Sequence, residues 1–253
     1  MRITRIHTSQ TLQSDATILL ESEPSRHLAR VLRLGVGDTV TLFNGLGGEY
    51  PGEITVLDKK HMQVMTGTHI QRECESDLNI HLGIAVSRGE RMDWIVQKAT
   101  ELGVSSLTPL TTAHAGLRLT GDRADKKRQH WQKIAISACE QCGRNRVPSI
   151  NPLIEVSSWL VDTQAERKFV LHHRAAPTGI SGKTPASIAL LVGPEGGLSA
   201  AEIAAAEQSG YVALRLGPRV LRTETAPLAA IAILQVYWGD MLPDQDRPTG
   251  RNI

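Results

Sequence analysis

The stretch Leu190-Leu191-Val192-Gly193-Pro194-Glu195-Gly196-Gly197-Leu198-Ser199 is the most informative part of this 253-residue chain. It joins an apolar run, typical of a buried strand, to a helix whose start is marked by the capping box Ser199-Ala200-Ala201-Glu202. A second loop at 216–227, Leu-Gly-Pro-Arg-Val-Leu-Arg-Thr-Glu-Thr-Ala-Pro, also follows a short apolar run and leads into the most hydrophobic helix predicted. Two strand-to-helix junctions opened by Gly-Pro predict one ligand site that is built mainly from backbone.

The two loops do not match the common phosphate-binding motifs. No Lys-Ser/Thr pair follows the glycines at 193–197, and their spacing is not that of a dinucleotide-binding fingerprint. Glycines instead allow the backbone to approach a flat ligand closely, and an adenine ring can be bound by backbone N–H and C=O groups. A plain turn would not need three glycines and a proline, so the ligand interpretation is favoured.

The second loop holds a polar tetrad, Arg222-Thr223-Glu224-Thr225, inside an apolar stretch. Thr225 can cap the following helix, which accounts for part of this polarity. Capping does not explain Arg222 and Glu224, and burying unpaired polar groups costs free energy. These two side chains are therefore predicted to be functional.

From residue 78 onwards, strand and helix patterns alternate. Strands are predicted at 78–86, 104–110, 167–173, 188–192 and 212–216, and helices at 92–102, 122–142, from Ser199 and from Pro227. This alternation predicts an α/β domain with a parallel sheet and helices on both faces. Ligands of such sheets bind beyond the carboxyl ends of the strands, where Gly193 and Gly217 fall.

The first 72 residues have a mostly β pattern, with a short helix predicted at 24–32 and strands at 4–8, 39–43, 49–57 and 61–66. A small β-barrel is the expected shape. The polar, aperiodic segment 68–77 marks the boundary, so we expect domains at 1–72 and 73–243, followed by a polar tail at 244–253.

Composition restricts the class of protein. No apolar run approaches the roughly 18 residues that span a bilayer, and the N-terminus lacks the apolar core of a secretory signal. Three cysteines without framework spacing favour a reducing compartment, with the cytoplasm as the default. Cys139-x-x-Cys142 has no second ligand pair, so we interpret it as helix packing and expect no metal site.

The segment 118–146 is locally basic: eight Lys/Arg stand against three Asp/Glu, whereas the whole chain has a net charge of only +2. Such a patch can bind phosphates, although a solvated helix face is equally compatible with charge alone.

The motifs of the two loops resemble those of a known family. Gly193-Pro194-Glu195-Gly196-Gly197 and Leu216-Gly217-x-Arg219-x-Leu221-Arg222-x-Glu224-Thr225-Ala226 resemble the closing loops of SPOUT-class RNA methyltransferases, in particular the 16S ribosomal RNA uridine-N3 methyltransferase family (the RsmE type). Further matching segments are Lys98-Ala99-Thr100-Glu101-Leu102-Gly103-Val104, Ser137-x-x-Glu140-Gln141-x-Gly143-Arg144 and His27-x-x-x-Val31-Leu32-Arg33. The resemblance covers essentially the whole chain to about residue 242.

The resemblance implies a fold, a cofactor and partners. It implies a SPOUT-type knotted parallel sheet with a C-terminal trefoil knot, and an N-terminal PUA-like barrel that helps to hold RNA. S-adenosyl-L-methionine would be the methyl donor, with no metal. The partners would be 16S rRNA or the small ribosomal subunit and a second copy of the chain, whose interface we place on the apolar helix 228–238. Methylation of a ribose 2′-OH, or a non-catalytic role in ribosome assembly, are the alternatives.

Site residues are assigned on the same basis. The expected cofactor-binding residues are Leu191, Gly193, Glu195, Gly197, Leu216, Leu221, Thr223, Thr225 and Ala226. As catalytic groups we expect Glu224 or Glu140 to accept the uracil N3 proton and Arg222 or Arg144 to stabilise the negative charge on the uracil oxygen. The candidate RNA-binding residues are Arg2, Arg5, Arg30, Arg33, Lys98, Arg144 and Arg146.

Overall fold

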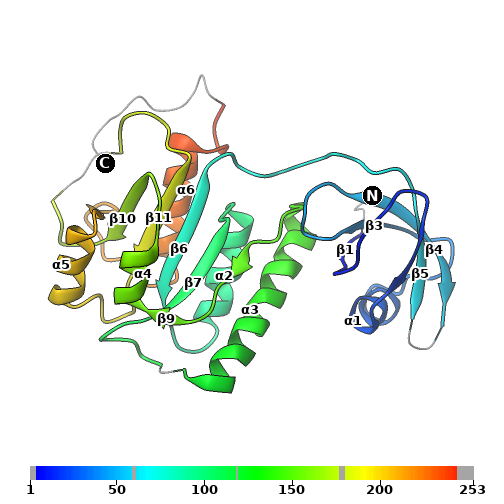
Figure 1. Cartoon of the computed structure of the whole chain (residues 1–253), viewed down its shortest axis with the longest axis horizontal. Coiled ribbons are helices and arrows are strands. Elements are labelled where there is room, and N and C mark those ends of the chain that lie inside the picture. The colour runs from blue at the N-terminus through cyan, green and yellow to red at the C-terminus, as the bar shows by residue number, and fades with distance from the viewer. Residues whose placement is uncertain (1–3, 59–60, 118, 177–179, 244–253) are drawn as a thin grey trace. The chain divides into compact units, whose positions relative to one another are not determined.

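A computed structural model of the chain describes residues 4–58, 61–117, 119–176 and 180–243. These residues form two compact units (Figure 1). The first contains the chain up to Glu75 together with Ile136–Val147, and the second contains Ser76–Ala135 and the chain from Pro148 onwards. The expected division was a single cut after residue 72, whereas the first unit also includes the end of a long helix. The predicted polar tail, 244–253, lies outside the described residues.

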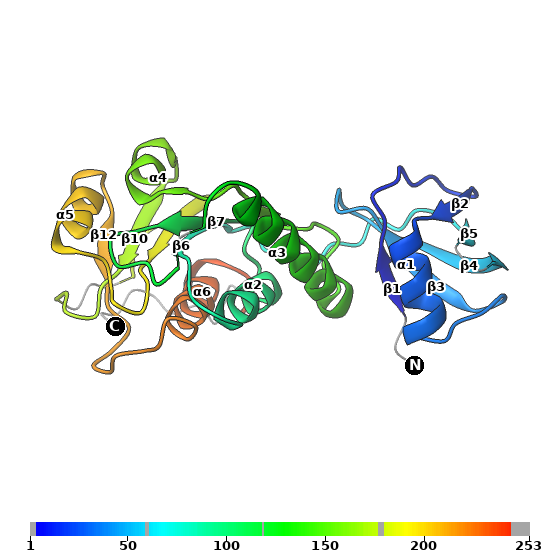
Figure 2. The ribbon, with the colours of Figure 1, turned by 90° about the horizontal axis from the view of Figure 1, so that it is seen from below.

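The first unit is built on a five-stranded sheet in the order β1-β3-β4-β5-β2. Its strands are β1 Arg5–His7, β2 Thr17–Leu20, β3 Thr39–Phe43, β4 Tyr50–Leu57 and β5 Met62–Thr66. β1 pairs with β3 in parallel, and the other pairs are antiparallel. The helix α1 Ser22–Arg26 continues into a π-helical turn, η1 His27–Val31, beside the sheet (Figure 2). The core of this unit includes Leu20, Leu28, Leu42 and Ile54, all fully buried.

The second unit is built on a seven-stranded sheet, and every pairing in it is parallel. Its order is β12-β10-β11-β6-β7-β8, with β9 also paired to β7. The strands are β6 Asn79–Ala85, β7 Ser106–Thr111, β8 Ser149–Ile150, β9 Ile154–Glu155, β10 Arg167–Leu171, β11 Ser187–Val192 and β12 Val212–Leu214.

Helices cover both faces of this sheet. They are α2 Arg91–Glu101, α3 Gly121–Cys142, α4 Val156–Asp162, α5 Ala200–Gln208 and α6 Ala226–Trp238. Figure 2 shows α2 and α6 on one face of the sheet and α4 and α5 on the other. The expected fold class, a parallel α/β sheet flanked by helices with a small N-terminal β domain, is confirmed. The trefoil knot stays a prediction, because strand order does not define how the chain is threaded.

A partly buried polar cluster centred on His81 lies against the core of the second unit. His81 Nε2 is 2.7 Å from Thr108 Oγ1 and also accepts a hydrogen bond from the Trp159 indole N–H at 3.4 Å. Trp159 can pack this closely because β6 has Gly83 beneath it, where a Cβ would stand 2.5 Å from the indole ring. Burial lowers the pKa of His81 below its ordinary value.

The sign of this pKa shift predicts acid sensitivity. In the unfolded chain His81 takes up a proton near pH 6.5, whereas the folded protein resists protonation. The stabilisation is therefore complete above pH 6.5 and is lost as the pH falls below it. We expect the melting temperature of the second unit to fall between pH 7 and pH 5.5, and to fall less in His81→Gln.

Tryptophan fluorescence reports this unit alone, because all four tryptophans, Trp94, Trp131, Trp159 and Trp238, belong to it. An equally steep fall in His81→Gln would show that another group causes the acid sensitivity.

Candidate functional site

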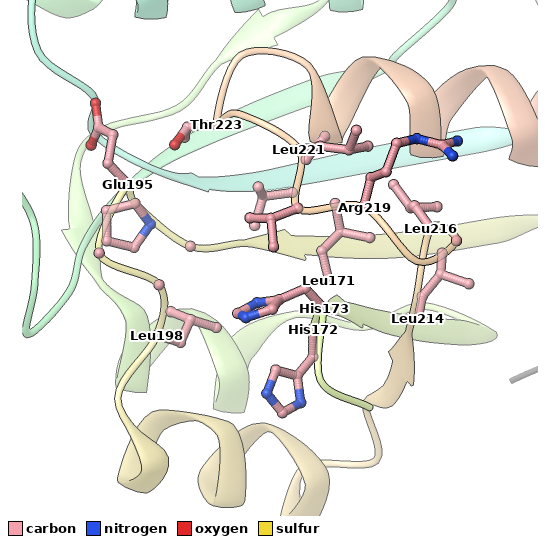
Figure 3. A pocket seen from close by; sticks show the side chains of 18 residues that line it. Leu171, His172, His173, Glu195, Leu198, Leu214, Leu216, Arg219, Leu221 and Thr223 are labelled. Carbon is pink, nitrogen blue, oxygen red and sulfur yellow. The ribbon is translucent and has the colours of Figure 1, made fainter. Parts of the chain in front are cut away.

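A pocket lies at the carboxyl edge of the parallel sheet, where β10, β11 and β12 end (Figure 3). Three segments line it, each following one of these strands. They contribute Leu171, His172 and His173; Val192, Gly193, Pro194, Glu195, Gly196, Gly197 and Leu198; and Leu214, Leu216, Gly217, Arg219, Val220, Leu221, Thr223 and Ala226. The pocket is therefore where a parallel α/β sheet is expected to bind its ligand.

The first loop turns sharply against the helix that follows. The Gly197 N–H donates to the Pro194 carbonyl at 2.8 Å, and Gly197 has a φ of 72°, a conformation that favours glycine. A Cβ at Gly193 would stand 2.9 Å from the backbone nitrogen of Leu198. The sequence-predicted capping box is confirmed: Ser199 and Glu202 exchange side-chain and backbone hydrogen bonds at the start of α5.

The second loop ends in a tight turn before α6. The N–H groups of Thr225 and Ala226 both donate to the Arg222 carbonyl at 2.9 Å, and Pro227 occupies the first turn of the helix. Thr225 stands at the N-cap position, but its side chain makes no capping hydrogen bond. Side-chain capping therefore does not explain the polar tetrad.

The pocket brings together seven of the nine residues predicted for the cofactor. These are Gly193, Glu195, Gly197, Leu216, Leu221, Thr223 and Ala226. Leu191 is fully buried in β11, where it belongs to the core beneath the pocket, and Thr225 is exposed at the start of α6.

Beside the pocket lies an ion-pair group that the sequence-based predictions did not include. It is formed by Glu195, which lines the pocket, and by Arg91 and Glu224, which are not among the lining residues. Arg91 Nη1 lies 2.6 Å from Glu195 Oε1, and Arg91 Nε lies 3.8 Å from Glu224 Oε2. Glu224 is half-buried, and Arg222 is exposed. The sequence does contain one signal for this group: Arg91 is a basic residue at the very start of α2, where the helix dipole disfavours a cation.

Glu140 and Arg144 belong to the first unit and have partners within it. Glu140 Oε1 accepts the backbone N–H of His7 at 3.0 Å, and burial raises the pKa of Glu140. Arg144 is only 5% exposed, and its Nη2 lies 2.6 Å from Glu75 Oε2. These contacts stabilise the first unit, whereas Glu224 and Arg222 lie on the loop that lines the pocket.

The candidate RNA-binding residues differ in how accessible they are. Arg30, Arg33 and Arg146 are exposed. Arg5 forms an ion pair with Glu49 and lies over the Phe43 ring at 4.9 Å, so it is largely occupied within the fold.

The remaining candidates are Lys98 and Arg2. Lys98 Nζ lies 2.8 Å from Glu101 Oε1 and 5.1 Å from the centroid of the half-exposed Trp94 ring. Arg2, like Arg118 of the basic segment, lies outside the described residues.

Cys139 and Cys142 lie at the end of α3, where Cys139 is buried, whereas Cys74 is exposed outside this helix. Burial raises the pKa of Cys139 to about 12, and its thiol donates to the Arg146 carbonyl at 3.7 Å. Within the described residues, no three His, Cys, Asp or Glu side chains are placed to hold a metal ion. In the same part of the chain, no helix is long and apolar enough to cross a membrane.

Comparisons with known proteins point to one family. Residues 74–235 match the RNA methyltransferase domain, and residues 20–64 match the RNA methyltransferase PUA domain. The chain is 35% identical over 243 residues to the ribosomal RNA small subunit methyltransferase E of Buchnera aphidicola subsp. Schizaphis graminum, which covers 95% of this chain and 98% of the relative. It is 30% identical over 237 residues to the protein of the same name from Bacillus subtilis, which covers 90% and 93%.

Solved structures agree with the sequence relatives. A ribosomal RNA small subunit methyltransferase E from Neisseria gonorrhoeae, bound to S-adenosyl methionine, superposes with a TM-score of 0.90 at 38% identity and covers 95% of this chain and 100% of that chain. A methyltransferase from Legionella pneumophila in complex with the same cofactor gives a TM-score of 0.91 at 36% identity, with the same coverage.

Glu202 connects the end of the first pocket loop, at Ser199, to the segment after β7, at Ala113. Its carboxylate accepts the N–H of Ser199 at 2.7 Å and the N–H of Ala113 at 2.8 Å. Burial alone would raise the pKa of Glu202, but the hydrogen bonds from Ala113 and Ser199 hold it below its usual value.

We therefore predict that Glu202→Ala destabilises the second unit by about 1–2 kcal/mol, because two backbone donors lose their acceptor. This is a fall of a few degrees in melting temperature, measured by tryptophan fluorescence. Glu207→Ala, at an exposed position of the same helix, should melt like the parent protein. Equal melting temperatures for the two variants would contradict this role of Glu202.

Proposed function

Because the chain belongs to the RNA methyltransferase family, we propose that it transfers the methyl group of S-adenosylmethionine to N3 of a uridine in 16S ribosomal RNA, in the cytoplasm. One observation carries this proposal. The pocket of two Gly-Pro loops lies at the carboxyl edge of the sheet in a chain whose cofactor-bound structural relatives cover 95% of its length.

The pocket suits this cofactor. Leu198, Leu216 and Leu221 supply an apolar wall for the adenosine part, and the loop backbones supply N–H and C=O groups for the adenine edge. Gly197 and Gly217 both have positive φ with open space where a Cβ would point, so the backbone can approach a ligand there. S-adenosylmethionine, when bound, supplies the activated methyl group.

The chain's own residues then orient the reactants and handle one proton. N3–H of uracil must be lost as the methyl group arrives, in a single displacement without a covalent enzyme intermediate. We assign the proton to Glu224, because it lies on the pocket loop and its side chain is half-buried rather than engaged in the first unit. Arg222, on the same loop, is assigned to the uracil oxygen on which negative charge develops. Glu140 and Arg144 are less suited, since both are engaged within the first unit.

Binding of the RNA requires accessible positive charge. The exposed Arg30 and Arg33 lie within the segment that matches the PUA domain, and Arg146 is exposed at the end of the basic segment. Guanidinium groups bind phosphates through paired N–H donors. We therefore propose that the small ribosomal subunit, or its 16S rRNA, is held partly by the first unit.

A second copy of the chain is the other proposed partner. Helix α6 buries Ala230, Ile231, Leu234 and Trp238, yet most of its partly exposed positions are also apolar. Leu228, Ala229, Ala232, Ile233 and Val236 remain partly exposed. A helix that is apolar all round needs cover on every side, which supports a homodimer formed through α6.

Cofactor binding and transfer can be tested separately. Isothermal titration with S-adenosylmethionine or S-adenosylhomocysteine should show one site per chain. Glu224→Gln keeps the shape of the side chain but removes the proton acceptor, so we expect its cofactor affinity to stay within about threefold and its single-turnover transfer to 16S rRNA to slow by about 10²-fold or more. Absence of cofactor binding by the parent protein would contradict the proposed function. Full activity of Glu224→Gln would remove that residue from the mechanism.

The dimer is tested by sedimentation at micromolar concentration. We expect the parent protein to sediment as a dimer and Ile233→Asp to shift toward monomer, because a carboxylate would be buried in the interface. Val161→Asp is the matched control, since Val161 is 72% exposed on α4. A monomeric parent protein would overturn the interface.

A further inference from the structure

Arg91 connects two loops of the pocket that are distant in sequence. Glu195 comes from the loop after β11 and Glu224 from the loop after β12, and the Arg91 guanidinium pairs with both, at 2.6 Å and 3.8 Å. The three side chains are partly exposed, at 42%, 36% and 25% respectively. They therefore lie where solvent and a substrate can reach them.

Stability alone does not explain an arginine at this position. Arg91 is the first residue of α2, where the helix dipole disfavours a cation, and Asp93 already supplies the favourable acidic charge in the first turn. Partly exposed ion pairs also contribute little to folding. The placement of Arg91 is better explained by its ion pairs with the carboxylates of Glu195 and Glu224.

Two carboxylates that share one guanidinium would repel each other without it. A guanidinium presents several N–H donors in a fixed fork, so it can hold two acceptors in defined directions at once. Here Nη1 faces Glu195 and Nε faces Glu224. Glu195 thus fixes Arg91 from the other loop through a hydrogen bond, and the charge of Arg91 attracts the Glu224 carboxylate across a longer ion pair.

We propose that Arg91 is a positioning residue for methyl transfer: it holds the Glu224 carboxylate in the orientation in which that group accepts the uracil N3 proton. This inference rests on the proposed function. It adds α2, an element outside the pocket lining, to the machinery of the site. Arg91 acts through Glu224, so its effect must disappear when Glu224 can no longer accept a proton.

The test is a double-mutant cycle on single-turnover methyl transfer at saturating cofactor and 16S rRNA. Arg91→Ala should slow transfer by about tenfold or more, while the cofactor affinity from isothermal titration changes by less than about threefold. In the Glu224→Gln background, Arg91→Ala should slow transfer by less than about twofold. Arg91→Gln serves as a second variant of similar length if the alanine variant does not fold.

The matched control is Arg72→Ala. Arg72 is 45% exposed and pairs with Glu49 at 2.9 Å in the first unit, so it loses a comparable ion pair without touching the pocket loops. Melting temperatures from tryptophan fluorescence check that the Arg91 variants fold.

Three results would overturn the inference. First, the Arg91→Ala variant could transfer the methyl group as fast as the Arg72→Ala variant. Second, Arg91→Ala could slow transfer by the same factor in the Glu224→Gln background as in the parent protein. Third, Arg91→Ala could weaken cofactor binding while the single-turnover rate at saturating cofactor stays unchanged. In each case the parent protein is active and the proposed function stands. A parent protein that neither binds the cofactor nor transfers a methyl group fails the proposed function itself, and this inference with it.

Discussion

The candidate site depends on the parallel pairing of β10 with both β11 and β12. Val170 lies opposite Leu191 on one side, and Leu171 lies opposite Leu214 on the other. Because all three strands run in the same direction, their carboxyl ends meet at one edge of the sheet. The loops that begin at Leu171, Val192 and Leu214 are therefore brought together although they are far apart in sequence. Neither Gly-Pro loop forms the pocket by itself. The parallel register of the strands brings the two loops together.

Charged groups are used differently in the two units. In the first unit, the carboxylates and guanidiniums of the interior are paired: Glu75 holds the buried Arg144, and Glu49 binds Arg5. Such groups cost free energy when left alone, so their pairing is a condition of the fold. Beside the pocket, Arg91, Glu195 and Glu224 are paired but partly exposed. That exposure leaves the three side chains accessible to solvent and to a substrate.

Local signals in the sequence predicted much of the fold and the pocket. The capping box at Ser199 and the apolar run before Gly193 act over a few residues, and both are found where the pattern placed them. Strands β2, β8 and β9 and helix α4 were not predicted; β8 and β9 have only two residues each, too few to show a period.

Tertiary contacts could not be predicted from the sequence, because their partners are far apart along the chain. Arg91 pairs with Glu195 over 104 positions, and Glu140 binds the backbone of His7 over 133. No spacing rule connects such residues. Leu191 is an error of another kind. It lies next to the first pocket loop in the sequence, yet its side chain belongs wholly to the core.

The proposed function specifies which atom of which RNA is methylated. It is tested most directly by mass mapping of 16S rRNA, isolated from cells that lack this protein and then incubated with the purified chain and S-adenosylmethionine as naked RNA and as small subunits. We expect a new N3-methyluridine at one position of 16S rRNA in at least one of the two substrates. A ribose 2′-O-methyl group would contradict it in favour of the other SPOUT chemistry, and RNA that is bound but unmodified would favour a non-catalytic assembly protein.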